Sequence, residues 1–148
     1  MLMNLKDYKD YGDVKRLLAE CMWAADEELD EKVEQVLAGY IANACTELLG
    51  CYENGRLAGI IGFMRHSRKA AEIRHLAVQE QWRGKGIGRK MVEELRRTAE
   101  YDTITAETDH DAVGFYRNNG FAVKSLGEKY PGVERFICSL SLNDAERS

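Results

Sequence analysis

The sequence lacks several features that would assign it to a function class at once. Its four cysteines show no Cys-x-x-Cys spacing and follow no signal peptide, so we expect reduced, mostly buried thiols in a cytoplasmic protein. The three histidines are scattered at His66, His75 and His110, a pattern that predicts no metal site. No apolar run approaches the roughly 20 residues of a membrane-spanning helix, so no membrane partner is expected.

The chain also has no surplus of positive charge. Its net charge is −4 and its isoelectric point is near 5.5, so we expect no general nucleic-acid partner. An acidic protein can attract a cationic amine. Internal repeats and low-complexity segments are absent, and hydrophobic residues make up 45% of the chain, which is ordinary for one globular domain. We therefore expect a single domain over residues 1–142 and a flexible tail over residues 143–148.

The most informative stretch runs from Ala70 to Ala99. Ala70–Val78 is rich in apolar residues and predicts a strand, and from Ile87 onward the apolar positions follow one face of an amphipathic helix. Between them, three glycines alternate with larger residues from Gly84 to Gly88. Their missing side chains let backbone N–H groups approach a ligand, and the dipole of the helix favours an anion there.

The charges around these glycines predict a phosphate ligand. Arg83, Lys85, Arg89 and Lys90 crowd the start of the helix, where cations oppose the helix dipole unless an anion binds nearby. The alternative is that Arg89 and Lys90 each pair with a glutamate one turn on, Glu93 or Glu94.

Two familiar phosphate loops fit poorly. A Walker loop needs Ser or Thr after Gly-Lys, and here Gly86 follows Lys85. A dinucleotide-binding loop needs a third glycine where Arg89 stands, although Glu107 lies at a suitable distance for its ribose carboxylate. A hairpin also precedes this strand, whereas the first strand of that fold normally opens the domain. A nicotinamide-binding module remains an alternative.

Arg83, Gly86 and Gly88 fit the pattern Gln/Arg-x-x-Gly-x-Gly/Ala. The segment resembles motif A of the GCN5-related N-acetyltransferase (GNAT) superfamily. The resemblance implies that acetyl-CoA is the acyl donor. It implies that backbone amides of Leu76 and Val78 bind the pantetheine arm, and that the pyrophosphate is bound by Arg83, Gly84, Lys85, Gly86, Ile87, Gly88 and Arg89.

A second segment, from Ala112 to Phe121, resembles the family signature Ala-x-x-Phe-Tyr-x-x-x-Gly-Phe. The resemblance implies that Tyr116 points at the sulfur of the cofactor and acts as general acid. A phenol with a pKa of ~10 is protonated at neutral pH and can give its proton to a leaving thiolate. The alternative is an aromatic pair that packs a short helix. Asp109 stands where many relatives have a cofactor-contacting asparagine, and it adds negative charge near an anionic ligand.

An amine nucleophile needs a group that takes its proton. Glu72 aligns with the general-base glutamate of histone-acetylating members of the family. Strand alternation predicts that Glu72 shares one face with Arg74, Leu76 and Val78, with His75 and Ala77 on the other. Three alternatives remain: Glu72 pairs with Arg74 or another cation, His75 is the base, or water relays the proton.

The remaining pattern predicts an α/β (α+β) fold, a GNAT-like, mixed, mostly antiparallel sheet of six to seven strands with about four helices. Asn54-Gly55 between apolar runs predicts a hairpin. The other expected elements are a strand within Met1–Lys9, a helix capped by Asp13, a helix after Asp26, a strand over Thr103–Ala106, a helix capped by Asp109 or Asp111, and a last hairpin of Phe121–Val123 and Val133–Leu140.

These observations predict an acetyl-CoA-dependent N-acetyltransferase that moves an acetyl group directly to a primary amine of a small molecule or peptide. No cysteine lies beside a histidine in either motif, so no acyl-enzyme is expected. A non-catalytic acyl-CoA-binding sensor on the same fold is the alternative. Members of the family often form homodimers, which makes a homodimer a further expectation.

Overall fold

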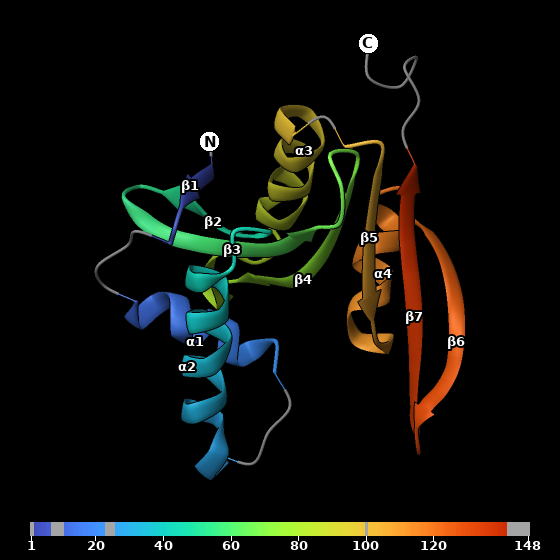
Figure 1. The fold of residues 1–148 in the computed structure, drawn as a ribbon, viewed down its shortest axis with the longest axis horizontal. Coiled ribbons are helices and arrows are strands. Elements are labelled where there is room, and N and C mark those ends of the chain that lie inside the picture. Colours follow the sequence, from blue (N-terminus) through green and yellow to red (C-terminus); the bar gives the residue numbers. More distant parts are fainter. Residues whose placement is uncertain (1, 7–10, 23–25, 100, 142–148) are drawn as a thin grey trace.

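The computed structural model describes residues 2–6, 11–22, 26–99 and 101–141 (Figure 1). Seven strands form one sheet in the order β1-β2-β3-β4-β5-β7-β6, which confirms the expected mixed sheet. The strands are β1 (Leu2–Asn4), β2 (Thr46–Glu53), β3 (Arg56–Arg65), β4 (Ala70–Val78), β5 (Thr103–Thr108), β6 (Ala122–Tyr130) and β7 (Val133–Ser141). The helices are α1 (Gly12–Glu20), α2 (Asp26–Ala42), α3 (Ile87–Ala99) and α4 (His110–Asn118), with a short 3₁₀ turn η1 (Glu80–Trp82).

The sheet divides between β4 and β5. These two strands pair in parallel, but only where Ala70–Ile73 lies beside Thr103–Ala106. The other neighbouring strands of the described sheet pair antiparallel. Beyond Ile73 the two strands separate, and Figure 1 shows the β5–β7–β6 half turning away from β1–β4.

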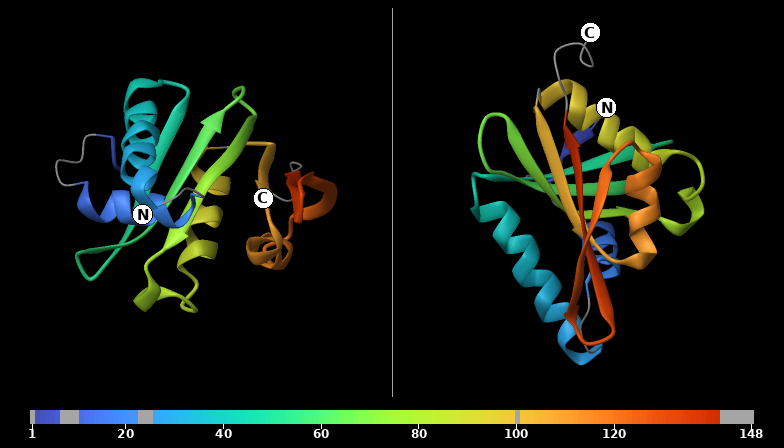
Figure 2. Two further views of the ribbon diagram at one scale, coloured as in Figure 1. Left: turned by 90° about the horizontal axis from the view of Figure 1, so that it is seen from below. Right: turned by 90° about the vertical axis from the view of Figure 1, so that its right-hand side faces the viewer.

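Helices cover both faces of the β1–β4 half. Figures 1 and 2 show α1 and α2 on one face and α3 on the other, with α4 beside β5 and β7. Apolar stripes on these helices account for the arrangement. Buried Leu17 and Leu18 of α1 and Val33, Leu37 and Tyr40 of α2 form one core with the sheet. The other core contains Met91, Val92 and Leu95 of α3, together with Tyr116 and Phe121.

A β-bulge interrupts β4. Gly62 of β3 lies opposite His75, and the next residue, Phe63, lies opposite Ile73, so Arg74 is the extra residue on β4. An extra residue shifts the alternation of side chains by one position. Before the bulge, Ile73 packs into the core under α3.

The bulge makes the predicted grouping of side chains on β4 wrong. After it, Leu76 and Val78 pack against the α3 core, whereas Ala77 belongs to the core under α1 and α2. Glu72 precedes Ile73 and therefore lies on the α2 face of the sheet, which is the face of His75 and not that of Leu76. Simple alternation could not show this, because nothing in the residue pattern marks the extra residue.

Several local predictions are confirmed and others are wrong. The side chain of Asp109 caps α4, and Asn54 and Gly55 form the β2–β3 turn with φ of 51° and 77°. Asp13 is not a cap, because it lies inside α1 after Tyr11. β1 is shorter than expected, and β6 continues to Tyr130 instead of ending at Val123. Residues 143–148 lie outside the described residues, as do residue 1 and residues 7–9 of the predicted first strand.

Candidate functional site

The glycine loop ends at the start of α3 in an open conformation. Gly84 and Gly86 have φ of +74° and +81°, in the left-handed region that favours glycine. A Cβ atom at either position would meet no atom within 4 Å, so the space in front of the loop is free. The carbonyl of Gly86 accepts the backbone N–H of Lys90 at 2.9 Å, and the first turn of α3 carries no acidic residue. The loop therefore presents a helix N-terminus to an anion.

Backbone groups of β4 point into the space left by the separation from β5. Gln79 donates its N–H to the carbonyl of Ala58 in β3 at 2.8 Å. Because successive N–H groups of a strand point to opposite sides, the N–H of Val78 points away from β3, and so does that of Leu76 two residues earlier. The carbonyl oxygens confirm this direction. Val78 O accepts Arg83 Nε at 3.0 Å and Leu76 O accepts Cys21 Sγ at 3.6 Å.

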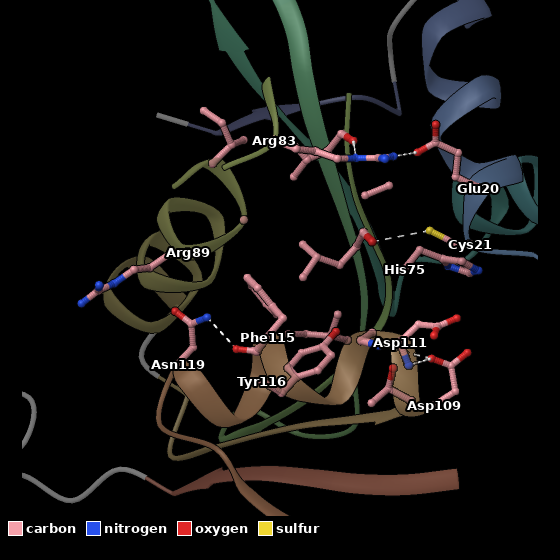
Figure 3. A pocket seen from close by; sticks show the side chains of 18 of the residues that line it. Glu20, Cys21, His75, Arg83, Arg89, Asp109, Asp111, Phe115, Tyr116 and Asn119 are labelled. Atoms are coloured by element: carbon pink, nitrogen blue, oxygen red, sulfur yellow. Dashed lines mark hydrogen bonds and ion pairs between the residues drawn. The ribbon is translucent and has the colours of Figure 1, made fainter. Parts of the chain in front are cut away.

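A groove of about 1300 Å³ joins the loop, this strand edge and α4. Figure 3 shows its side chains converging from β4, α1, α4 and the start of α3. The predicted site residues that line it are Leu76, Val78, Arg83, Gly84, Gly86, Ile87, Gly88, Arg89, Asp109 and Tyr116. Lys85 and Glu72 are not among the lining residues. Both family-like segments thus meet in one groove.

The cations of the loop have different partners. Arg83 reaches across to α1, where its Nη2 lies 2.9 Å from a carboxylate oxygen of Glu20. Lys85 Nζ lies 5.1 Å from the centre of the Trp82 ring. Lys90 pairs with Glu53 at 3.0 Å, and the charge of Glu94, one turn on, adds to the raised pKa of Lys90.

Arg89 is exposed, and in Figure 3 its side chain points away from the other drawn residues. No ion pair within 4 Å is found for it in the part of the chain that the structure describes. Its guanidinium is therefore available to a phosphate that lies outside the loop.

Tyr116 is almost fully buried, with 6% of its surface exposed. Its ring stands edge-on to Phe115 and to Phe121, with ring centres 5.2 Å away in both cases. Burial raises the pKa of the Tyr116 hydroxyl above its usual range. The hydroxyl is consequently protonated at neutral pH. Tyr116 is both an aromatic packing residue and a groove residue, so the two interpretations of this signature are compatible.

The carboxylate of Asp109 is held by the backbone of α4. Its Oδ1 accepts the N–H groups of Asp111 and Ala112 at 3.0 and 3.3 Å. This arrangement satisfies the first N–H groups of the helix and offsets part of the negative charge.

Glu20 and Cys21, at the end of α1, line the groove without having been predicted as site residues. Cys21 Sγ donates to Leu76 O and Leu17 O, both at 3.6 Å. Burial raises the pKa of this thiol to about 11, so it is a thiol rather than a thiolate at neutral pH. No sequence motif marks the end of α1. The apolar spacing of the helix indicated only that Cys21 faces inward.

The two candidate bases differ in their surroundings. The carboxylate of Glu72 lies 2.8 Å from His66 Nε2 and 3.5 Å from Arg74 Nη2, so the predicted alternative, a pair with Arg74, is observed. His75 lines the groove, and its Nδ1 lies 2.5 Å from the Tyr40 hydroxyl. Burial, with the nearby charge of Arg74, lowers the pKa of His75 to about 4.

No helix in the described ranges is long and apolar enough to cross a membrane. Within residues 2–6, 11–22, 26–99 and 101–141, no three His, Cys, Asp or Glu side chains come together in an arrangement that could hold a metal ion.

Solved structures share this fold at low sequence identity. An aminoglycoside 6'-N-acetyltransferase complexed with coenzyme A matches 95% of this chain over 96% of its own, with a TM-score of 0.70 and 17% identity. A protein assigned to the GNAT family from Desulfovibrio desulfuricans matches 95% of this chain over 98% of its own, with a TM-score of 0.75 and 19% identity. A GNAT family acetyltransferase from Elizabethkingia anophelis with acetyl-CoA bound matches 96% over 97%, with a TM-score of 0.67 and 16% identity.

The search of curated protein sequences finds no match. A family model does match. The model described as "Acetyltransferase (GNAT) domain" covers residues 5–134, which include the glycine loop, both sides of the groove and the Tyr116 helix. The chain therefore belongs to the GNAT acetyltransferase family.

Proposed function

We propose that this protein is an acetyl-CoA-dependent N-acetyltransferase whose acceptor is a primary amine of a small molecule or peptide. One observation carries the proposal. An open glycine loop at a helix N-terminus, outward-pointing amides of β4 and a protonated tyrosine all line the same groove. The similar aminoglycoside 6'-N-acetyltransferase, whose name specifies an amino group as acceptor, supports this class of reaction.

The residues of the groove fit the acyl donor. The loop is open at Gly84 and Gly86, and its backbone N–H groups before α3 are the proposed donors to a diphosphate, with Arg83 and Arg89 as cations. The N–H groups of Leu76 and Val78 suit the carbonyl oxygens of a pantetheine arm and of its thioester, since they lie along the edge of β4 where β5 has separated. Lys85 and Asp109 complete the proposed set, Lys85 through its charge and Asp109 at the start of α4.

The chemistry needs stabilised negative charge on oxygen and a proton for the leaving group. When bound, acetyl-CoA supplies an activated thioester. The N–H of Leu76 is the proposed donor to the carbonyl oxygen as charge develops there. Tyr116 is the proposed acid for the departing sulfur. A thiol with a pKa of ~8.5 leaves tolerably well unaided, so the tyrosine contributes rate without being indispensable. Since Cys21 stays protonated, direct transfer is favoured over a thioester on this cysteine.

Two measurements on the purified protein test the proposal. Calorimetry with coenzyme A should show binding, and release of free thiol from acetyl-CoA should depend on an added amine drawn from a panel of polyamines, aminoglycosides and peptides. Binding without amine-dependent thiol release from any of these would favour the acyl-CoA-binding sensor. Absence of coenzyme A binding, or a fluorescence response to NADH instead, would overturn the proposal.

A further inference from the structure

His75 lines the groove and contacts the buried Tyr40, and the proposed donor site uses neither side chain. His75 lies on β4 next to Leu76, whose backbone is the proposed donor to the thioester oxygen. In Figure 3, His75 and Cys21 lie on the same side of β4, the side that faces α1. We propose that His75, positioned by Tyr40, is the base that takes the proton of the acceptor amine. This inference rests on the proposed function.

The bulge at Arg74 gives His75 its place. Without the extra residue, the alternation of β4 would point the side chain at position 75 into the α3 core, as it does that of Ile73. With the bulge, His75 faces α2 while Leu76 faces the other side. One strand segment thereby supplies two adjacent functions, a backbone donor and an imidazole, at the edge of a groove.

Tyr40 holds the imidazole through a contact that three elements build. Its hydroxyl lies 2.5 Å from His75 Nδ1, and the two rings meet edge to face with centres 5.5 Å apart. Tyr40 is 4% exposed. A Cβ atom on Gly62 of β3 would lie 2.2 Å from the Tyr40 hydroxyl oxygen, so only glycine lets the phenol reach this position. The contact with Tyr40 therefore fixes the position of the His75 ring.

The protonation of the pair follows from its neighbours. The ionisable groups around it are Arg74 and Glu72 on β4 and Cys21 at the end of α1. Burial and Arg74 lower the pKa of His75 to about 4, and burial raises the pKa of Tyr40 above its usual range. Both groups are therefore neutral at pH 7. The proposal requires the tautomer in which Nδ1–H donates to the Tyr40 oxygen, because Nε2 then keeps a lone pair for the amine.

The step balances without a further reactant. The amine nitrogen forms a bond to the acetyl carbon, and its proton passes to His75 Nε2. The carbon–sulfur bond breaks, and the sulfur takes a proton from the hydroxyl of Tyr116. A nitrogen that has begun to bond to the acyl carbon is far more acidic than a free ammonium, so a weakly basic imidazole can accept its proton. The imidazolium then loses its proton to water, and the tyrosinate regains one.

Glu72 is less suited to the same role. It is outside the groove lining, and its carboxylate is already bound by His66 and Arg74. We infer that it acts at a distance, by holding Arg74 near His75.

The first test compares three variants by kcat, KM and calorimetric affinity for coenzyme A. His75→Gln should lower kcat by about 100-fold or more with unchanged coenzyme A affinity. His66→Gln, the same chemical change outside the groove, should keep wild-type kcat. Glu72→Gln should lower kcat by only a few fold. Wild-type kcat in His75→Gln, or a larger loss in Glu72→Gln, would overturn the assignment.

The second test separates positioning from folding. Two-bond ¹H–¹⁵N spectra of the wild-type protein should show His75 neutral and protonated at Nδ1 at pH 7. Tyr40→Phe should shift the His75 ring toward the Nε2–H tautomer. The same variant should lower kcat more than it changes KM. Arg74→Gln should move the acidic limb of the kcat profile to higher pH. An Nε2–H tautomer in the wild-type protein would overturn the role of Tyr40.

Failures of the two proposals are distinguishable. Coenzyme A binding with no thiol release from any amine by the wild-type protein would overturn both. Amine-dependent release that survives in His75→Gln would overturn only the assignment of the base.

Discussion

The two sides of the groove are built in different ways. The proposed donor side consists mostly of backbone from one contiguous segment, the end of β4, the glycine loop and the start of α3. The proposed acceptor side consists of side chains from α1, α2 and β4, brought together by a bulge and a buried tyrosine. A site that binds diphosphate and amide groups needs hydrogen-bond donors, and the backbone N–H groups of any chain can supply them. A site that moves a proton needs particular side chains, which can come from anywhere in the sequence.

The largest expected effect is a loss of coenzyme A affinity when the backbone of the glycine loop is changed. Gly86→Val puts a β-branched side chain at φ of +81°, a conformation that costs such residues about 1–3 kcal/mol. The loop should relax to negative φ and turn its N–H groups away from the diphosphate. We expect a loss of at least ~100-fold in coenzyme A affinity by calorimetry, about the 2.7 kcal/mol that two powers of ten represent.

Gly39→Val is the control for that change. Gly39 lies in α2 outside the groove, and a Cβ there would meet no atom within 4 Å. Its coenzyme A affinity should match that of the wild-type protein. Equal losses in both variants would show that the glycines of the loop have no special part in binding.

A second prediction concerns how the stability of the folded protein depends on pH through His75. Because the pKa of His75 falls to about 4 in the folded protein from 6.5, the unfolded chain binds the extra proton between these values. Stability should therefore be full above pH 6.5 and fall as the pH drops toward 4, by about 2 kcal/mol at pH 5. Chemical denaturation at pH 7.5 and pH 5 should show this loss in the wild-type protein and a smaller one in His75→Gln. An equal loss in both would mean that His75 is not buried in neutral form.

A third, smaller effect should appear where the two sides meet. Tyr116→Phe removes the proposed acid and keeps the ring between Phe115 and Phe121. We expect kcat to fall by about tenfold, because a thiolate leaves fairly well without help, and coenzyme A affinity to stay the same. Steady-state kinetics with the best amine of the panel provide the measurement. An unchanged kcat would reduce Tyr116 to a packing residue.

The smallest effect concerns the ion pair that spans the groove. Arg83 binds Glu20 in an exposed pair, and such pairs contribute only about 0.2–1 kcal/mol. Glu20→Gln frees the guanidinium for the diphosphate and removes a negative charge from the groove. Coenzyme A affinity should rise two- to threefold at low salt and converge with that of the wild-type protein at high salt. A decrease at low salt would contradict the predicted role of Arg83.

Prediction from the sequence was most accurate where neighbouring residues settle the structure. Asn54-Gly55 can hold positive φ and gave the expected hairpin, and Asp109 caps α4 because its short carboxylate reaches the next N–H groups. The first strand and the cap of α1 were less predictable. Asp13 has the composition of a cap, but it lies inside the first turn of α1, 3.2 Å from Arg16.

The glycine loop, the centre of the proposed donor side, could be predicted from the sequence, since its alternate glycines, its cations and the following helix are local features. The proposed acceptor side depends on tertiary structure. The bulge at Arg74 is set by the pairing of β3 with β4, and the contact between Tyr40 and His75 depends on the absent side chain of Gly62, residues far apart along the chain. Local rules cannot encode such a contact, because its energy comes from packing between elements that meet only after folding.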